Sequence, residues 1–323
     1  GAGRSSVRME LELRPGRPGP CLRCRPECAP GTPAWAGTST TVQRGLRLIA
    51  EGALDDGNVE KLADRLGVTS RHLRRLFTRH VGASPLAVAH TQRLHFAKRL
   101  IDQTSLPMKA VALAAGFGSV RRFNDTFQHT YGKPPRALRR GSDGAGAPGE
   151  LELLLPYRKP YGWSRLLEFF AGRATPGVER VGTACYERTI RLGDRCGVIR
   201  VRDRDGALSL AVHGVETGFL FSVVQRVRGM FDVDAPIDDI RAVLRRDPQL
   251  QNRLRRNPGV RVPGAWDGWE LTVRAVLGQQ VSVKAATTFA GRIAERYGEP
   301  PGPGEQEHGV EERVVRQADE DQE

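Results

Sequence analysis

The chain lacks a long hydrophobic run, and it contains few cysteines. No segment approaches the roughly 18 consecutive apolar residues that a membrane-spanning helix needs, so we expect no membrane partner. Five cysteines in 323 residues do not make the disulfide framework of a secreted protein. The first residues also lack the apolar segment of a signal peptide. These absences favour a protein of the reducing cytoplasm.

Basic charge, by contrast, is plentiful and unevenly placed. The chain has 50 Lys and Arg against 37 Asp and Glu, a net charge of +13. Residues 1–140 hold 24 basic and 10 acidic side chains, residues 141–298 hold 24 and 18, and residues 299–323 hold 2 and 9. A nucleic-acid backbone is the partner that such an excess favours, and it would bind the first segment. The last segment is acidic and aperiodic, so we expect it to be disordered.

Two copies of a helix-turn-helix pattern lie within residues 57–131. In the first copy, apolar residues recur at helical spacing up to Gly67, where glycine can end a helix. A second helix then begins with Thr69 or Ser70 as its N-cap and carries several basic side chains on its outer face. One such pair is as often an ordinary helical hairpin as a DNA-binding motif.

The second copy strengthens the case for DNA binding. Its first helix begins at Pro107, the chain turns at residues 116–118, and Ser119 caps a helix that carries Arg121 and Arg122. A connecting helix over residues 85–100 can place the two basic helices in successive segments of a major groove. Tandem copies, both with a basic second helix, therefore predict a DNA-binding domain.

The second copy also resembles a known family. Ala114-Ala115-Gly116-Phe117, the following Ser119, Phe123 and Phe127, and the string at residues 131–135 are similar to the DNA-binding domain of AraC-type regulators. The resemblance covers about residues 40–140 and implies that the partner is double-stranded DNA. It assigns Phe117, Phe123 and Phe127 to the core. It implies the following groove-facing residues: Ser70, Arg71, Arg74, Arg75, Ser119, Arg121 and Arg122.

A cysteine pair near the N-terminus has the spacing of half a zinc site. The two-residue gap between Cys21 and Cys24 lets both thiolates reach one zinc ion, although an isolated pair of this kind is as often redox-active or incidental. Residues 21–27 are similar to the second ligand pair in the zinc domain of the Ada-type adaptive-response family. No cysteine precedes Cys21, so we expect an incomplete zinc site and loss of the family's methyl transfer to a thiolate.

The sequence pattern changes after residue 151. Alternating or apolar stretches predict strands at residues 186–192, 198–201 and 208–212, and Asp205-Gly206 is a strong two-residue hairpin turn. Helical patterns flank these strands, which predicts an α+β domain. The predicted helices of this part span residues 163–171, 217–231, 237–246, 269–277 and 281–297.

Two strings in this part resemble bacterial AlkA-type 3-methyladenine DNA glycosylases: residues 160–171 and residues 273–282. The resemblance covers residues 153–298 and implies that a damaged nucleotide is flipped out of the duplex. It places Gln279 and Gln280 at the wedge that fills the gap and makes Phe169 a wall of the base pocket. An aromatic face attracts an alkylated purine because that base is positively charged. On the residues alone, Phe169 would be core and Gln280 a surface amide.

No catalytic residue can be assigned. The family's glycine-rich hairpin and catalytic aspartate lie beyond the similar stretch, and Asp319 and Asp321 have no helix-hairpin-helix around them. Two hypotheses remain. The first is DNA-3-methyladenine glycosylase II activity, hydrolysis of the N-glycosidic bond of alkylated purines, coupled to transcription regulation. The alternative is an AraC-type DNA-binding regulator without catalysis.

The sequence thus predicts a multidomain chain: an all-α double helix-turn-helix, an α+β domain, and the start of an α-helical helix-hairpin-helix glycosylase domain. No small-molecule cofactor is expected, zinc is doubtful, and the location is the bacterial cytoplasm at the nucleoid. We also expect residues 259–298 to expose apolar helix faces. The predicted boundaries are a partial zinc module at 1–36, the DNA-binding domain at 37–140, a linker at 141–152, the α+β domain at 153–258, the start of the glycosylase domain at 259–298, and the tail at 299–323.

Overall fold

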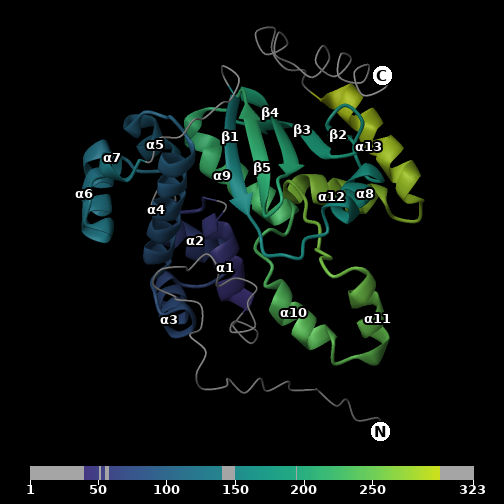
Figure 1. Ribbon diagram of the computed structural model, residues 1–323, viewed down its shortest axis with the longest axis horizontal. Helices are drawn as coiled ribbons and strands as arrows, with labels where there is room; N and C mark the ends of the chain where they lie inside the picture. The colour runs from purple at the N-terminus through teal and green to yellow at the C-terminus, as the bar shows by residue number, and fades with distance from the viewer. Residues whose placement is uncertain (1–39, 51, 55–57, 140–149, 194, 299–323) are drawn as a thin grey trace.

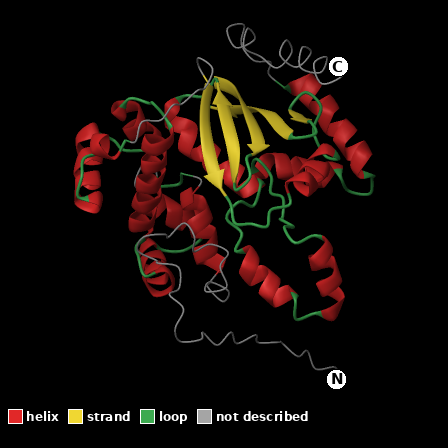
Figure 2. Ribbon diagram, viewed as in Figure 1, coloured by secondary structure: helices red, strands yellow, loops and turns green. Residues whose placement is uncertain are grey.

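The computed structural model has an all-helical half followed by a half built on one β-sheet (Figures 1 and 2). Cys21 and Cys24, and the acidic tail, lie outside the residues that it describes. The described residues are 40–50, 52–54, 58–139, 150–193 and 195–298.

The helical half contains both predicted helix-turn-helix motifs, α2–α3 and α5–α6, joined by the long helix α4. Thr69 caps α3, because its hydroxyl accepts a hydrogen bond from the His72 N–H at 3.3 Å, and Ser119 caps α6 in the same way. Gly67 has φ +70°, a conformation that glycine adopts without strain. The helices are α1 Thr40–Ala50, α2 Val59–Arg65, α3 Ser70–Val81, α4 Pro85–Gln103, α5 Met108–Ala114, α6 Val120–Tyr131 and α7 Pro135–Leu138.

The second half contains a five-stranded antiparallel sheet with the strand order β1-β5-β4-β3-β2. Asp205 (φ +41°) and Gly206 (φ +110°) form the predicted hairpin turn between β4 and β5. Strand β1 begins at Glu150, so regular structure starts within the stretch predicted as linker. The strands are β1 Glu150–Pro156, β2 Glu179–Val181, β3 Cys185–Leu192, β4 Arg195–Asp203 and β5 Ala207–His213.

Helices cover the sheet and extend the chain away from it, which confirms the predicted fold class. A short 3₁₀ turn, η3 (Thr217–Phe219), precedes α9. The helix pair α10–α11 projects from the sheet half in Figure 1, and α12 and α13 lie at the end of the molecule far from α6. The helices are α8 Trp163–Ala171, α9 Leu220–Met230, α10 Ile237–Leu244, α11 Pro248–Arg256, α12 Gly268–Leu277 and α13 Val283–Tyr297.

The two halves share a hydrophobic core through α4. The N-terminal part of α4 packs Val88 and Ala89 against α1, α2 and α3 in one apolar cluster. Its C-terminal part contributes Phe96 and Leu100 to a second cluster that runs continuously into the sheet half. Phe96 meets Phe221 of α9 edge to face, with ring centroids 5.2 Å apart. The second helix-turn-helix motif and the sheet are therefore one packed body.

Candidate nucleic-acid interfaces

Helix α3 presents the first set of predicted DNA contacts. Arg71, Arg74 and Arg75 are exposed, while Ser70 at the start of the helix is half-buried. The Arg74 guanidinium donates to the Glu60 carboxylate at 3.1 Å, and both side chains are more than half exposed. Such an exposed pair is weak, so Arg74 can exchange its carboxylate for a DNA phosphate at little cost.

Helix α6 presents the second set. Ser119, Arg121 and Arg122 are exposed, with Arg121 and Arg122 in the first turn of the helix. The Ser119 oxygen accepts the Arg122 backbone N–H at 3.2 Å, which leaves its hydroxyl hydrogen able to donate to an acceptor on DNA. The structure places the arginines predicted to face the groove on the exposed surface of the second helix of each motif, with Ser119 exposed just before α6 and Ser70 half-buried at the start of α3.

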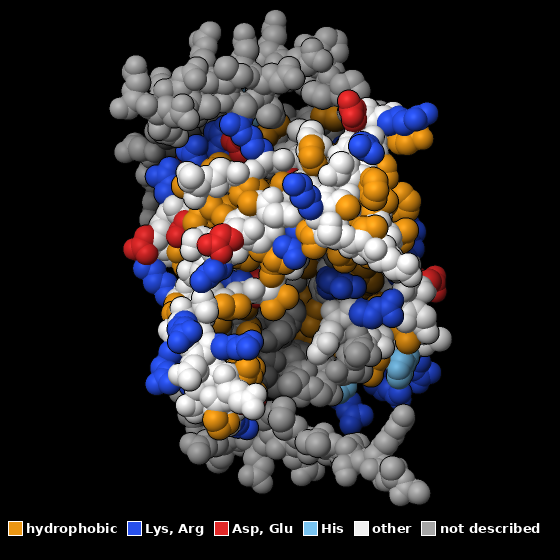
Figure 3. All heavy atoms as spheres, turned by 90° about the vertical axis from the view of Figure 1, so that its right-hand side faces the viewer, with side chains coloured by type: hydrophobic (Ala, Val, Ile, Leu, Met, Phe, Trp, Pro, Cys, Tyr) orange, Lys and Arg blue, Asp and Glu red, His pale blue; other side chains and the backbone are white. Residues whose placement is uncertain are grey.

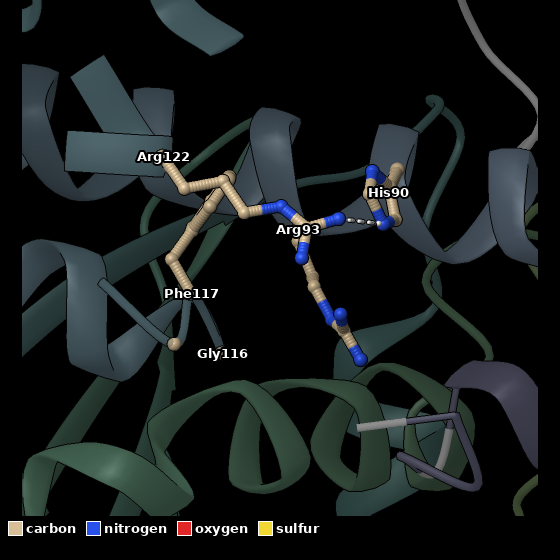
Figure 4. Close-up of a pocket in the computed structure, with 6 residues that line it drawn as sticks. His90, Arg93, Gly116, Phe117 and Arg122 are labelled. Atoms are coloured by element: carbon tan, nitrogen blue, oxygen red, sulfur yellow. Dashed lines mark hydrogen bonds between the residues drawn. The ribbon is translucent and has the colours of Figure 1, made fainter. Parts of the chain in front are cut away.

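Arg122 also faces a small cleft between α4 and the turn before α6 (Figure 4). Its guanidinium lies 3.5 Å from Nε2 of His90. Burial, together with the positive charges of Arg122 and Arg93, holds the pKa of His90 below its ordinary value of 6.5. The neutral imidazole can therefore accept a hydrogen bond from Arg122 and orient it. The cleft is lined by His90, Arg93, Gly116, Phe117, Gly118 and Arg122.

Phe169 lies on the outer side of α8, as a pocket wall would. Its side chain is 37% exposed, whereas the neighbouring Phe170 is 6% exposed and packs against Tyr186 and Phe231. The Arg173 guanidinium lies over the Phe169 ring, 3.9 Å from the centroid. The ring face therefore holds a cation already, and a positively charged base would have to displace Arg173 to stack there.

The turn between α12 and α13 carries the two predicted wedge residues. Gln279 and Gln280 are both exposed. The backbone of Gln280 has φ +60°, in the left-handed region that residues other than glycine rarely adopt. Ser282 then caps α13 by accepting the Ala285 N–H at 3.2 Å. A strained residue at an exposed turn is a common feature of functional sites, and the backbone here points an amide side chain away from the protein.

A cleft of about 170 Å³ lies beside this turn. Arg173 lines this cleft and also lies over the Phe169 ring, and Gly278 and Val281, the residues on either side of Gln279 and Gln280, line it as well. The lining contains two arginines and no carboxylate in the part of the chain described. Its residues are Arg173, Arg274, Gly278, Val281, Val283, Ala286, Thr287 and Ala290.

A buried ion network holds α12, and hence the turn, against the sheet. Arg274 of α12 bonds to Glu179 of β2 and donates to the Thr175 hydroxyl at 2.7 Å. Arg188 of β3, with its side chain 2% exposed, bonds to Glu270 of α12. Sequence reasoning missed this network, because its members are up to 99 residues apart and nothing in their local pattern distinguishes them from surface charges.

Glu179 remains ionised in this network although it is buried. Burial by itself raises the pKa of a carboxyl group. The hydrogen bonds from the Tyr186 hydroxyl and the Thr175 N–H, and the charges of Arg274 and Arg188, outweigh that effect and bring the Glu179 pKa below its ordinary value of 4.5. The carboxylate thus stays charged between two guanidinium groups.

The exposed apolar faces predicted for residues 259–298 are present. Trp269, Leu271 and Val276 on α12 are more than half exposed, and Tyr297 at the end of α13 is 73% exposed. None of the described helices is long and apolar enough to span a membrane. Over the same described ranges, no group of three or more His, Cys, Asp or Glu side chains is placed to hold a metal ion.

Two domain families match the chain. Residues 62–141 match the helix-turn-helix domain family, and residues 152–267 match the AlkA N-terminal domain family. The chain therefore matches these two domain families one after the other along its length.

Three similar proteins differ in how much of the chain they match and in the function that their names give. A Mycobacterium tuberculosis protein named "Probable bifunctional transcriptional activator/DNA repair enzyme AlkA" is 40% identical over 285 residues, which are 87% of this chain and 58% of that protein. The Escherichia coli protein "DNA-3-methyladenine glycosylase 2" is 33% identical over 153 residues, 45% of this chain and 50% of that protein. "HTH-type transcriptional regulator GlxA" of Rhizobium meliloti is 38% identical over 92 residues, 28% of each chain. The chain spans about half the length of the first two.

Proposed function

We propose that this chain, an AraC-type helix-turn-helix domain joined to an AlkA N-terminal domain, acts in the repair of alkylated DNA and in the regulation of genes for that repair. The observation that carries the proposal is the presence of two exposed basic helices, α3 and α6, and of the surface around Phe169 and Gln280 on one molecule whose two apolar clusters are joined through α4. The similarity to a bifunctional activator and repair enzyme over 87% of the chain supports the same reading.

The regulatory role rests on the seven exposed or half-exposed polar side chains of α3 and α6. Guanidinium groups bind phosphates and guanine edges bidentately, so Arg71, Arg74, Arg121 and Arg122 are suited to both positioning and readout. Fluorescence anisotropy with a labelled 30-base-pair duplex tests this role. We expect binding that weakens steeply as salt rises, because phosphate contacts release counterions.

The repair role rests on the surface around Phe169 and Gln280. By similarity to the glycosylases, an alkylated purine such as 3-methyladenine would leave the duplex, stack on Phe169, and be replaced in the helix by Gln279 or Gln280. The reaction would be hydrolysis of the N-glycosidic bond. An acidic group would stabilise the positive charge that develops on the sugar. No residue in the described part of the chain can be assigned to that role.

A second candidate function is DNA binding and regulation without catalysis. The cleft beside the wedge turn favours it for this polypeptide, since its lining contains Arg173 and Arg274 but no carboxylate. The deciding experiment measures release of 3-methyladenine from a methylated duplex by this chain, beside the binding measurement. Base release supports the enzyme, and binding without release supports the regulator. Failure to bind any duplex would contradict both.

The zinc half-site stays a prediction. Cys21 and Cys24 lie outside the described residues, so neither a zinc ion nor a methyl-accepting thiolate enters the proposed chemistry. A cytoplasmic location at the nucleoid follows from the proposed partner, double-stranded DNA, and is part of the same proposal.

A further inference from the structure

The two candidate DNA surfaces lie at opposite ends of the molecule. Figure 1 is viewed with the longest axis horizontal, and it shows α6 at one end of that axis and α13 at the other, with the sheet between them. The wedge turn joins α12 to α13 and so belongs to the second end. Helix α3 lies on the same side of the sheet as α6.

The connection between these ends is packed rather than flexible. Helix α4 carries side chains in both apolar clusters, and the ring of Phe96 contacts Phe221 of α9. The Gln103 side chain at the end of α4 makes two hydrogen bonds to the backbone of Leu154 in β1. A body held by such contacts cannot swing the wedge turn around to the helix-turn-helix side without breaking its core.

The second end has its own positive charge. In Figure 3, which faces that end, Lys and Arg side chains outnumber Asp and Glu and lie among apolar patches. Helix α11 has three exposed arginines and no acidic residue, and α13 has Lys284, Arg292 and Arg296 against a single Glu295. A phosphate backbone can therefore bind there without any help from α3 or α6.

We infer that the protein holds two separate stretches of duplex DNA at once, one on α3 and α6 and the other on the face formed by α11, α13 and the wedge turn. This inference rests on the proposed function, because it takes both surfaces as DNA-binding. A short duplex bound at one end does not reach the other, because the two surfaces lie at opposite ends of the molecule and DNA, with a persistence length of about 150 base pairs, resists strong bending over so short a length. The second stretch comes from another duplex or from a distant part of the same one.

A capture experiment tests the inference. The full chain is mixed with a biotinylated 30-base-pair duplex on beads and a fluorescent, methylated 30-base-pair duplex in solution, at low salt. We expect the beads to retain the fluorescent duplex. Two double variants each weaken one surface and leave the other unchanged. Arg71→Ala with Arg121→Ala lowers the positive charge of the surface on α3 and α6. Lys284→Ala with Arg292→Ala lowers the positive charge of the surface on α13. Each should still bind one duplex by anisotropy but capture at least tenfold less.

The outcomes separate this inference from the proposed function. Tight binding of one duplex without capture of a second overturns two-duplex binding and leaves the proposed function standing. Capture that both double variants perform as well as the original chain overturns it too, because self-association would then be the cause. Absence of binding to either duplex overturns both proposals. Arg195→Ala, an exposed arginine on β4 that pairs with Glu216, is the matched control and should capture normally.

Discussion

Gln103 and Leu154 are joined by a pair of hydrogen bonds, although they are 51 residues apart in the sequence. The Gln103 amide donates through Nε2 to the Leu154 carbonyl at 3.3 Å, and its Oε1 accepts the Leu154 N–H at 2.9 Å. Leu154 lies in β1, which is at the edge of the sheet, and no strand among the described residues pairs with its outer backbone groups. One side chain of α4 thus takes the place of a strand partner and connects the helical half to the sheet.

Removing this amide should loosen the junction. We expect Gln103→Ala to lower the free energy of unfolding by about 1 kcal/mol, because two partly exposed hydrogen bonds are lost, and to speed hydrogen exchange at the Leu154 amide. Urea denaturation and exchange mass spectrometry would measure the two effects. Gln249→Ala, at an exposed position of α11, is the control. Equal behaviour of the two variants would show that the junction does not depend on Gln103.

Glu179 should matter much more to stability than an exposed glutamate. Glu179→Gln leaves the guanidinium groups of Arg188 and Arg274 near one another without the shared carboxylate, which should cost about 3 kcal/mol. Glu168→Gln breaks only the exposed pair with Arg165, in which both side chains are more than 60% exposed, and should cost less than about 1 kcal/mol. Denaturant titrations of the two variants give the comparison. If the two variants lose similar free energies of unfolding, the ion network around Glu179 contributes no more to stability than an exposed ion pair.

The same carboxylate predicts a dependence on acid. The pKa of Glu179 is lower in the folded chain than its ordinary value of 4.5, so its contribution to stability is complete above that value and is lost as the pH falls through the folded pKa. We expect the original chain to lose more stability than Glu179→Gln on going from about pH 5 to about pH 3. If the original chain and Glu179→Gln lose the same amount of stability over this pH range, groups other than Glu179 cause the sensitivity to acid.

The recognition helices predict a specific change in salt dependence. Arg71→Ala and Arg121→Ala should each weaken duplex binding and reduce the slope of log affinity against log salt by about 1, as expected for one lost phosphate contact. Anisotropy titrations at several salt concentrations measure that slope, with Arg195→Ala as the control. An unchanged slope would mean that these arginines do not touch the backbone.

Truncation of Phe170 should mainly lower stability, whereas truncation of Phe169 should mainly change the preference for methylated DNA. Phe170 packs against Tyr186 and Phe231, so Phe170→Ala should cost about 3–5 kcal/mol of stability. Phe169→Ala should cost less than half as much, because the ring is partly exposed, but it should lower the preference for methylated over unmodified duplex. Thermal unfolding and competition binding separate the two effects. A Phe169→Ala chain with unchanged preference would remove Phe169 from the base pocket.

Local signals in the sequence predicted the local structure well. Gly67, Thr69 and Ser119 identified both helix-turn-helix motifs because capping and left-handed glycine depend on neighbouring residues only. Asp205-Gly206 identified the β4–β5 hairpin for the same reason. Strand β2 was not predicted, since three residues are too few to show alternation, and α11 was not predicted because it has no buried face.

The candidate site residues also differ in whether a local sequence signal predicted them. The basic positions of α3 and α6 followed from helical spacing, whereas Phe169, Gln279 and Gln280 came only from resemblance to glycosylases. Arg173 is four residues after Phe169, so helical spacing was available to predict the contact over the ring. The link from Arg274 to Glu179 had no such signal, because 95 residues separate them.

Helix α4 limits how these domains can be recombined. Its C-terminal part places Phe96 and Leu100 in a core shared with the sheet half, so a helical fragment cut after residue 139 would leave that surface open to water and prone to association. Exchange of the sheet half for an unrelated domain would require a new partner for the same surface. A junction engineered between these two halves therefore has to keep, or redesign, the face of α4 that carries Phe96 and Leu100.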